Sequence, residues 1–330
     1  MRFFIPGEFM KQSLAQRKTC WLLAAAGLLI TSAAPAETNS QAPGYYRMPL
    51  GKMTVTAVSD GTVTLPLEQL LTNISPETLQ KRLADDGISS LAETSINTFV
   101  IDTGKQKILI DAGAGSLIGK TGGHLLDNLR EAGYPPESID AVLITHIHSD
   151  HSGGISLNGK PAFPNAQVYV EQKDAEFWLN PAANLNKVSE DKKGMFNESV
   201  NAFNPIKTAG KLRTFNAPAT LVGGIRAFPA PGHTPGSVIY RVESEGQSLI
   251  FWGDLVHAKA VQMPDPKVAI HFDFDQPQAI KTRERILAQI AKEGSWVGAA
   301  HFSFPGFGHV KTDGNGYRWI PANYTIKVAQ

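Results

Sequence analysis

Four side chains that can bind a metal ion lie in one short segment, directly after an apolar run. They are His146, His148, Asp150 and His151. Residues two apart in an extended backbone point to the same side, so His146 and His148 can face a single ion. The glycine pair at 153–154 allows a tight turn, which can bring Asp150 and His151 to a second position nearby. The segment therefore predicts a metal site, because a solvated loop has no need of three histidines in six residues.

Three later residues extend this donor set. His233 lies in the Pro/Gly-rich turn APGHTPG, Asp254 follows Gly253 at the end of a strand-like run, and His301 follows the last predicted strand. Four ligands cannot fill the coordination of two ions, whereas seven can, so the full set predicts two divalent metal ions. Imidazole and carboxylate donors without thiolate suit zinc first, with iron, manganese or cobalt as alternatives.

The elements that must position these residues alternate between strands and helices, as is typical of a layered α/β domain. Strands are predicted at residues 53–58, 96–101, 107–110, 141–145, 168–170, 225–228, 237–242, 248–252 and 296–300, the last of them. Helices are predicted at residues 75–85, 125–132, 171–179 and 277–293, with an insertion of helix and loop at 180–217. Each half contains a strand followed by Asp (Asp111, Asp254), a helix, and a strand followed by His (His146, His301). This repeated order of strand, helix and strand predicts that all four side chains lie at one edge of the core.

The overall charge of the chain is balanced. It has 330 residues, with 31 basic and 30 acidic side chains and a formal net charge of +1. A protein that binds nucleic acid by neutralising phosphates is expected to be strongly basic, so the balance argues against a nucleic-acid partner. Hydrophobic residues make up 42% of the chain, enough for a large core, which excludes a disordered or fibrous protein.

Residues 1–36 have the pattern of a secretory signal peptide. Basic residues precede an apolar run at residues 20–30, and a small-residue cleavage site ends it: Lys11, Arg17 and Lys18, then Ala34-Pro35-Ala36. The apolar run is too short for a helix that spans a membrane, which favours a cleaved signal peptide. The alternative interpretation is an uncleaved membrane anchor.

Cleavage of this peptide would place the protein in the periplasm or outside the cell, without stable membrane insertion. It would also remove Cys20, the one cysteine of the chain, so neither a disulfide nor a thiolate ligand is expected. We expect residues 37–49 to form a polar N-terminal arm and residues 50–330 to form a single domain.

The order H-x-H-x-D-H, G-H-T-P-G, G-D and a late His resembles the metallo-β-lactamase superfamily over about residues 50–320. The resemblance implies an α/β fold, a four-layer αββα sandwich with metals at the edge between two sheets. It implies that His146, His148 and His233 bind the first metal. It further implies that Asp150, His151 and His301 bind the second metal and that Asp254 bridges the two. Asp111 would orient ligands without binding a metal.

Further segments resemble the branch of this superfamily that contains methyl parathion hydrolase and its lactonase and arylesterase relatives. They include SDGTV at residues 59–63 and HFSFPGFGH at residues 301–309. Members of that branch are exported two-metal hydrolases, commonly dimeric, so the resemblance implies a homodimer. It also implies a substrate pocket over the metals, lined here by Leu70, Ile118, Trp178, Met195, Phe196, His257, Ile270 and Phe272.

The expected reaction is attack by a metal-bridging hydroxide on a small lactone or aryl ester, with weak phosphotriesterase activity. Asp150 and Asp254 are the expected catalytic carboxylates. Three further activities are compatible with the motifs: a methyl parathion-like triesterase, a β-lactamase, and a sulfur dioxygenase with a single iron. An RNA-processing nuclease would need a large extra domain and a basic surface, and neither is indicated by the sequence.

Overall fold

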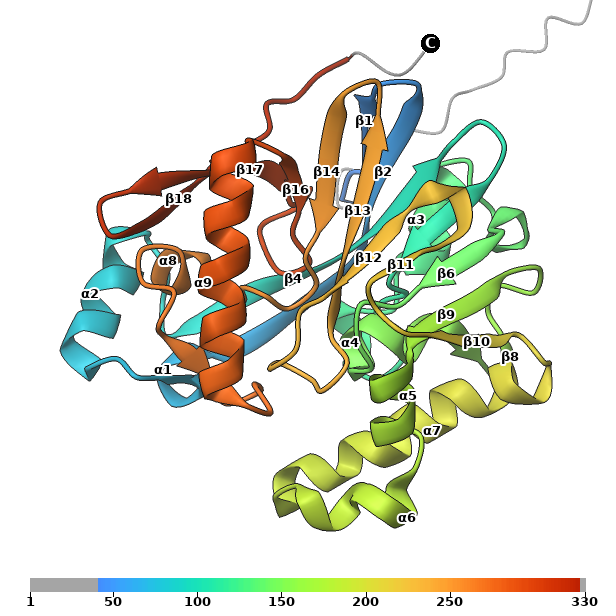
Figure 1. Cartoon of the computed structure of the whole chain (residues 1–330), viewed down its shortest axis with the longest axis horizontal. Helices are drawn as coiled ribbons and strands as arrows, with labels where there is room; N and C mark the ends of the chain where they lie inside the picture. Colours follow the sequence, from blue (N-terminus) through green and yellow to red (C-terminus); the bar gives the residue numbers. More distant parts are fainter. Residues whose placement is uncertain (1–40, 327–330) are drawn as a thin grey trace, which may run out of the picture. The chain divides into compact units, whose positions relative to one another are not determined.

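Two mixed β-sheets dominate the computed structural model, which describes residues 41–326 (Figure 1). The first sheet has seven strands in the order β1-β2-β4-β5-β6-β9-β10. Its first four strands pair antiparallel and its last four pair parallel. The strands are β1 (Tyr45–Leu50), β2 (Met53–Pro66), β4 (Leu91–Asp102), β5 (Lys107–Ile110), β6 (Ala141–Leu143), β9 (Gln167–Glu171) and β10 (Leu212–Phe215).

The second sheet also has seven strands, in the order β11-β12-β13-β14-β16-β17-β18. Only β14 and β16 pair parallel in it, among the residues described. The strands are β11 (Ala219–Thr220), β12 (Arg226–Pro229), β13 (Val238–Ser244), β14 (Gln247–Phe251), β16 (Trp296–Gly298), β17 (Phe307–Asp313) and β18 (Gly316–Pro321). Short strands β3 (Leu71–Thr72) and β15 (Ala269–Ile270) pair apart from both sheets, as do β7 (Ser156–Leu157) and β8 (Lys160–Pro161).

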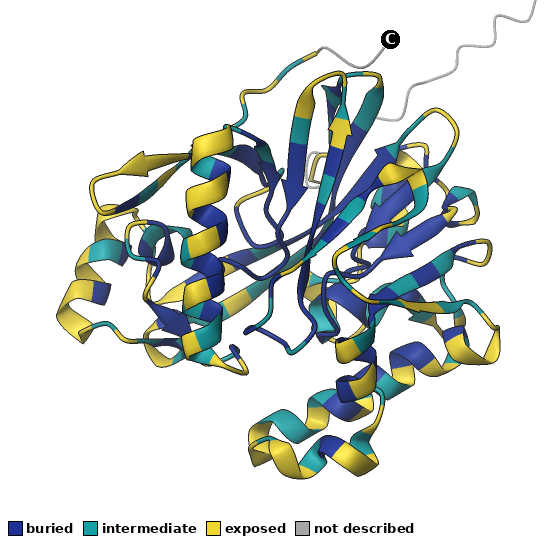
Figure 2. Cartoon of the chain, in the orientation of Figure 1, coloured by how far each residue is buried: buried dark blue, intermediate teal, exposed yellow. Residues whose placement is uncertain are grey.

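Helices cover the outer face of each sheet. Helices α3 (Leu125–Glu131), α5 (Gln172–Trp178) and α7 (Lys193–Thr208) pack on the first sheet, and α9 (Gln276–Glu293) packs on the second. The other α-helices are α1 (Leu67–Leu70), α2 (Pro76–Asp85), α4 (Ser149–Ser152), α6 (Pro181–Asn184) and α8 (Lys259–Gln262). Figure 2 shows one buried and one exposed face on α9, the pattern of a helix that covers a sheet.

Alternation of side chains along the central strands produces these layers. On β4, Phe99 and Ile101 point into the core between the sheets, whereas Val100 points to the helices. On β14, Leu249 faces the space between the sheets and Ile250 faces α9. Strands that are apolar on both faces must be covered on both faces, which gives the order helix, sheet, sheet, helix. The predicted αββα sandwich is confirmed.

The long helices begin and end where the sequence signals them. Ser75 precedes α2 and accepts a hydrogen bond from the Thr78 N–H at 3.2 Å. Asp275 caps α9 in the same way through the Gln278 N–H at 3.0 Å. Gly294 ends α9 with a φ of 71°, a left-handed conformation that glycine adopts without strain.

Among the described residues, four strands of four residues or more lie outside the predicted set, as do five strands of two residues. Residues 45–49 of the expected arm belong to β1, which pairs with β2 along its whole length. Strand β10 closes the first sheet within the expected helix-and-loop insertion. Strands β17 and β18 follow the strand that was predicted to be the last. These segments carry polar residues or glycines and lie at or near sheet edges, so their apolar alternation is weak.

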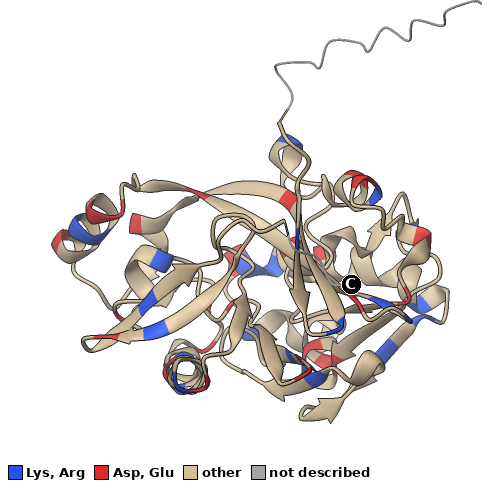
Figure 3. Cartoon of the chain, turned by 90° about the horizontal axis from the view of Figure 1, so that it is seen from above, with Lys and Arg blue, Asp and Glu red and all other residues tan. Residues whose placement is uncertain are grey.

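The predicted signal peptide and the first residues of the arm lie outside the described residues. Between residues 41 and 326, no helix combines the length and the apolar character that crossing a bilayer requires. Basic and acidic residues are interspersed over the helices, strands and loops seen in Figure 3.

Leu287→Ala should lower the free energy of unfolding by about 2–5 kcal/mol, because Leu287 is fully buried between α9 and the second sheet. The measurement is chemical denaturation at fixed metal concentration. Lys281→Ala, on the exposed face of the same helix, is the control and should change stability by less than about 0.5 kcal/mol. Equal effects of the two substitutions would contradict the packing described here.

Candidate metal centre

The predicted ligands leave both sheets at the same edge. In the first sheet, the parallel neighbours β5 and β6 are followed by Asp111 and by the loop that carries His146. In the second sheet, the parallel neighbours β14 and β16 are followed by Asp254 and His301. His233 lies in the turn between β12 and β13. The repeated order of strand, helix and strand in the sequence therefore corresponds to two β-α-β units whose strand ends face one another.

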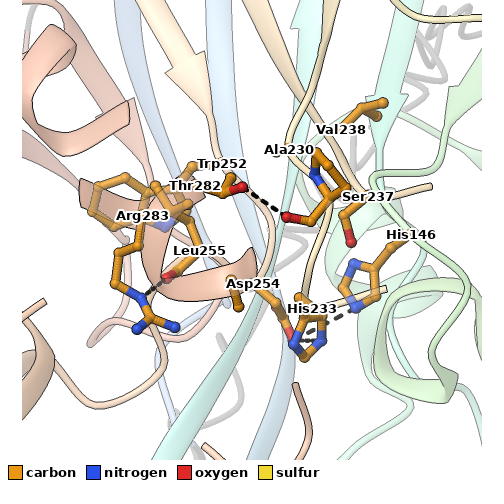
Figure 4. Close-up of a pocket in the computed structure, with 12 residues that line it drawn as sticks. His146, Ala230, His233, Ser237, Val238, Trp252, Asp254, Leu255, Thr282 and Arg283 are labelled. Carbon is orange, nitrogen blue, oxygen red and sulfur yellow. Dashed lines mark hydrogen bonds and ion pairs between the residues drawn. The ribbon is translucent and has the colours of Figure 1, made fainter. Parts of the chain in front are cut away.

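The first group of donors consists of His146, His148, His233 and Asp254, all buried. His148 Nδ1 lies 3.1 Å from His146 Nε2 and 2.9 Å from His233 Nε2. Asp254 Oδ2 lies 3.5 Å from His146 Nε2 and 3.1 Å from His233 Nε2. Figure 4 shows His146, His233 and Asp254 converging on one point. The geometry thus assigns Nδ1 of His148 and Nε2 of the other two histidines as donor atoms.

The second group consists of Asp150, His151, His301 and the same Asp254. Asp254 Oδ1 lies 2.8 Å from His151 Nε2 and 2.9 Å from His301 Nε2. Asp150 Oδ2 lies 3.6 Å and 3.5 Å from these two nitrogens. One carboxylate therefore serves both groups, with one oxygen directed to each, as the bridging role of Asp254 requires.

The donor atoms have the spacing of metal ligands. Donors about 2.0–2.1 Å from a tetrahedral zinc ion stand about 3.3 Å apart, and the distances above range from 2.8 Å to 3.6 Å. Among the described residues, Asp254 Oδ1 has no hydrogen-bond partner, although two imidazole nitrogens lie within 2.9 Å of it. A carboxylate oxygen and two imidazole nitrogens in this arrangement can bind one cation together, whereas a proton can join only two of them. The residues present therefore fit two divalent ions.

Buried partners fix the orientation of the second group. Asp111 Oδ2 accepts from His151 Nδ1 at 2.8 Å, and the same carboxylate accepts from the N–H and hydroxyl of Thr145. Asp111 has a φ of 58°, a strained conformation for a residue other than glycine. The Ser95 carbonyl accepts from His301 Nδ1 at 3.0 Å. The orienting position predicted for Asp111 is thus observed, whereas Ser95 was not assigned a role from the sequence.

In the first group, Asp273 holds His233. Its Oδ1 accepts from His233 Nδ1 at 3.0 Å, and its Oδ2 pairs with Arg283 at 3.3 Å. Arg283 is 1% exposed and donates also to the Leu255 carbonyl, as Figure 4 shows. Sequence reasoning missed both residues, because a single Asp in a polar loop and a single Arg in a helix carry no local signal of burial.

Charge within the cluster opposes protonation at some imidazoles and favours it at others. Burial and the neighbouring His151 charge lower the pKa of His146 to about 3. Burial also disfavours charge on His233, but the Asp254 and Asp273 carboxylates outweigh it and raise the pKa of His233 to about 9. Burial opposes charge on Asp254 too, yet the surrounding imidazoles, His151 first, hold the pKa of Asp254 well below its usual range. The cluster is therefore built around an ionised carboxylate.

The sequence model of the Metallo-beta-lactamase superfamily matches residues 91–301, which contain all seven ligands. The chain belongs to the metallo-beta-lactamase superfamily. Its centre consists of two buried groups of His and Asp donors that share Asp254.

Two solved structures of this superfamily's fold are similar over most of the chain. The hydrolase AbOPH of the beta lactamase superfamily is 36% identical, with a TM-score of 0.83, covering 87% of this chain and 100% of that one. AidC, a dizinc quorum-quenching lactonase in complex with a homoserine product, is 26% identical, with a TM-score of 0.79, covering 86% of this chain and 98% of that one.

Curated relatives match shorter stretches. The exodeoxyribonuclease WalJ of Streptococcus pneumoniae is 31% identical over 107 residues, which is 31% of this chain and 35% of WalJ. An N-acyl homoserine lactonase of a Bacillus species is 23% identical over 179 residues, 54% of this chain and 61% of the lactonase. The chain therefore spans about a third of the length of the first relative and less than two thirds of the second.

A cavity of about 180 Å³ opens over both groups of ligands. Four residues of the predicted pocket line it: Ile118, Met195, His257 and Phe272. Val63 and Leu65 of β2 complete its apolar wall and were not predicted. His257 Nε2 contacts Asp254 Oδ2 at 2.9 Å, and its ring stacks on His301. Trp178 lines an adjoining cavity of about 120 Å³, to which Met195 and Phe272 also belong.

Three residues of the predicted pocket line neither of these two cavities. Phe196 is fully buried and packs on Trp178 within the core of the first sheet, because its place on α7 faces the sheet. Leu70 and Ile270 belong to a separate apolar cluster around α2, where β3 pairs with β15. These three residues of the predicted pocket therefore lie in the packing around the two cavities and not on their walls.

Zinc affinity of the first group should rise as the pH is raised from 6 to 9. A proton must leave His233 before its Nε2 can bind a metal, and the pKa of His233 is raised to about 9. Below that pKa, zinc must displace one proton from His233. The apparent zinc affinity should therefore fall by up to about tenfold for each unit that the pH is lowered. Competition with a chromophoric chelator across this range measures the effect. A flat profile would contradict the assignment.

Asp273→Asn should weaken metal binding by about 10- to 100-fold, because it removes the charge that orients His233 while keeping the side chain's shape. The readout is the zinc dissociation constant. Asp275→Asn is the matched control, since Asp275 is exposed, lies two residues away and caps α9. The control should bind zinc as the unmodified protein does, and a loss shared by both variants would point to a general disturbance of the loop.

Proposed function

We propose that this protein is an exported two-metal hydrolase that opens lactones or cleaves aryl esters. The observation that carries the proposal is the pair of ligand groups sharing Asp254 at the floor of an apolar cavity. Cleavage after residue 36 and assembly as a homodimer belong to the same proposal.

The lining of the cavity supports a neutral substrate. Its walls are Val63, Leu65, Ile118, Met195 and Phe272, and none of the described residues that line it is a lysine or arginine. A phosphodiester backbone carries charge that proteins neutralise with such side chains. The lining therefore favours a flat, uncharged ester or lactone over the nucleic-acid substrates that the name of WalJ indicates for that enzyme.

Two divalent ions in this centre would lower the pKa of a shared water and polarise the substrate carbonyl. Asp254 would hold both ions from beneath, since its side chain is only 4% exposed. The Asp150 side chain is 25% exposed and faces the cavity, so it is the ligand carboxylate placed to exchange protons with a bound molecule. Asp150 would take the proton released when the ester is attacked and return it to the leaving oxygen.

Similarity to AidC supports the lactone as substrate, because that enzyme is a lactonase related along nearly its whole length. Phe272 adds bulk to the cavity wall and His257 adds a polar ring, which together disfavour a bulky tetrahedral phosphotriester. A triesterase of the methyl parathion type is the second candidate, since phosphotriesters are also uncharged. A β-lactamase would be recognised by cleavage of a β-lactam, and a sulfur dioxygenase by oxidation of a thiol.

Turnover of a small substrate panel by the purified, zinc-loaded protein tests the choice. The panel is dihydrocoumarin, an N-acyl homoserine lactone, phenyl acetate, methyl parathion, nitrocefin and single-stranded DNA. We expect kcat/KM for a lactone or aryl ester to exceed that for methyl parathion at least tenfold, which is about 1.4 kcal/mol of transition-state stabilisation. Dominance of the phosphotriester, the β-lactam or DNA would reject the proposed substrate class.

Removal of metal serves as the control for the mechanism. Exhaustive chelation should abolish turnover, and zinc should restore it, because the ligand groups consist of His and Asp and contain no serine, threonine or cysteine that could take the place of a metal-activated water. Thiol-dependent oxygen uptake with one iron per chain would instead favour a dioxygenase.

A further inference from the structure

One buried carboxylate joins the two loops that carry the first group of ligands. Asp174, in the first turn of α5, is 0% exposed. Its Oδ2 accepts from the Ile147 N–H at 2.7 Å, and its Oδ1 accepts from the Gly236 N–H, also at 2.7 Å. Ile147 stands between His146 and His148, and Gly236 is three residues after His233. All three histidines of the group are thus within three residues of a contact with Asp174.

The two loops belong to different sheets. The loop with Ile147 follows β6 of the first sheet, and the loop with Gly236 leads into β13 of the second. Neither sheet alone fixes the distance between His148 and His233, whose donor atoms are 2.9 Å apart. The Asp174 carboxylate provides a short, rigid link between these loops, and N–H bonds to an ionised acceptor are stronger than those to a neutral one.

The last glycine of the APGHTPG turn has its explanation here. A Cβ atom at Gly236 would collide with the Asp174 backbone nitrogen and with the Glu171 carboxylate. The absence of a side chain lets the loop approach the start of α5 closely enough for the Asp174 hydrogen bond.

Burial of this carboxylate is costly. Asp174 forms no ion pair with any residue in the described part of the chain. Burial raises its pKa to about 6, although the Thr234 side chain and the two N–H donors lower it. A buried charge without a counter-charge destabilises a fold unless hydrogen bonds compensate. Because Asp174 lies beside both ligand loops, we infer that its burial serves to hold these loops at a fixed distance.

We propose that Asp174 is a positioning residue that sets the spacing of His146, His148 and His233 and so fixes the metal affinity of the first group but not the second. The second group is held by Asp111 and the Ser95 carbonyl, neither of which contacts Asp174. The inference rests on the two-metal centre of the proposed function and not on the choice of substrate.

Stepwise zinc titration of the full-length protein at pH 8 tests the inference, with cadmium NMR to distinguish the group of three imidazoles from the group of two. In Asp174→Asn, the amide can accept only one of the two N–H bonds and opposes the other. We expect the first group to bind 10- to 100-fold more weakly and the second group to be unchanged. Glu171→Gln is the matched control, since Glu171 is a buried carboxylate that caps the same helix, and it should keep both affinities.

Gly236→Ala provides an independent variant, which leaves the carboxylate in place but separates the loop from it. Gly236→Ala should weaken zinc binding by the first group and leave the second group unchanged. This result tests the role of Asp174 even if Asp174→Asn does not fold. Equal weakening of both groups, or no weakening in a folded variant, would overturn the role of Asp174 alone. Failure of the unmodified protein to bind two ions would overturn the two-metal function as well.

Discussion

Asp254 imposes the constraint on which the rest of the centre depends. Its carboxylate is buried, directs one oxygen to each group of ligands and also contacts His257. A buried carboxylate is destabilising by several kcal/mol unless positive charge surrounds it. Five imidazoles do so here, but neutral imidazoles do not cancel the charge and protonated ones repel each other. Divalent cations would resolve this conflict, because they would neutralise Asp254 and keep the imidazoles unprotonated.

The groups that accept hydrogen bonds from the ligand histidines show how the fold holds these ligands in place. Carboxylates hold His151 and His233, and a carbonyl holds His301, each through the Nδ1 that faces away from the metal position. These contacts select one tautomer and one ring orientation before any ion arrives. Arg283, buried behind Asp273, extends the same support to helix α9. The centre is therefore preorganised by helix α9 as well as by the sheets.

Much of this could be predicted from the sequence, because the ligands of the first sheet are adjacent in the chain and each later ligand follows a recognisable strand end or turn. Apolar strands that alternate with helices predict a layered α/β domain, and the resemblance to the superfamily implies the αββα order of its layers. Asp174, Asp273 and Arg283 could not be predicted, since a single charged residue acquires its role only from contacts between distant elements. The pocket was predicted in part: Met195 and Phe272 line it, whereas Ile270 pairs with a strand that no local pattern indicates.

Each metal position takes ligands from both sheets: His146 and His148 face His233, and Asp150 and His151 face His301. A bound ion is consequently a removable cross-link between the two halves of the sandwich, closing a long loop of chain in the manner of a disulfide. In a chain that would lose its one cysteine on export, the ions would take over that function. Resistance of the protein to proteolysis would then depend on the local supply of metal as closely as the proposed catalysis would.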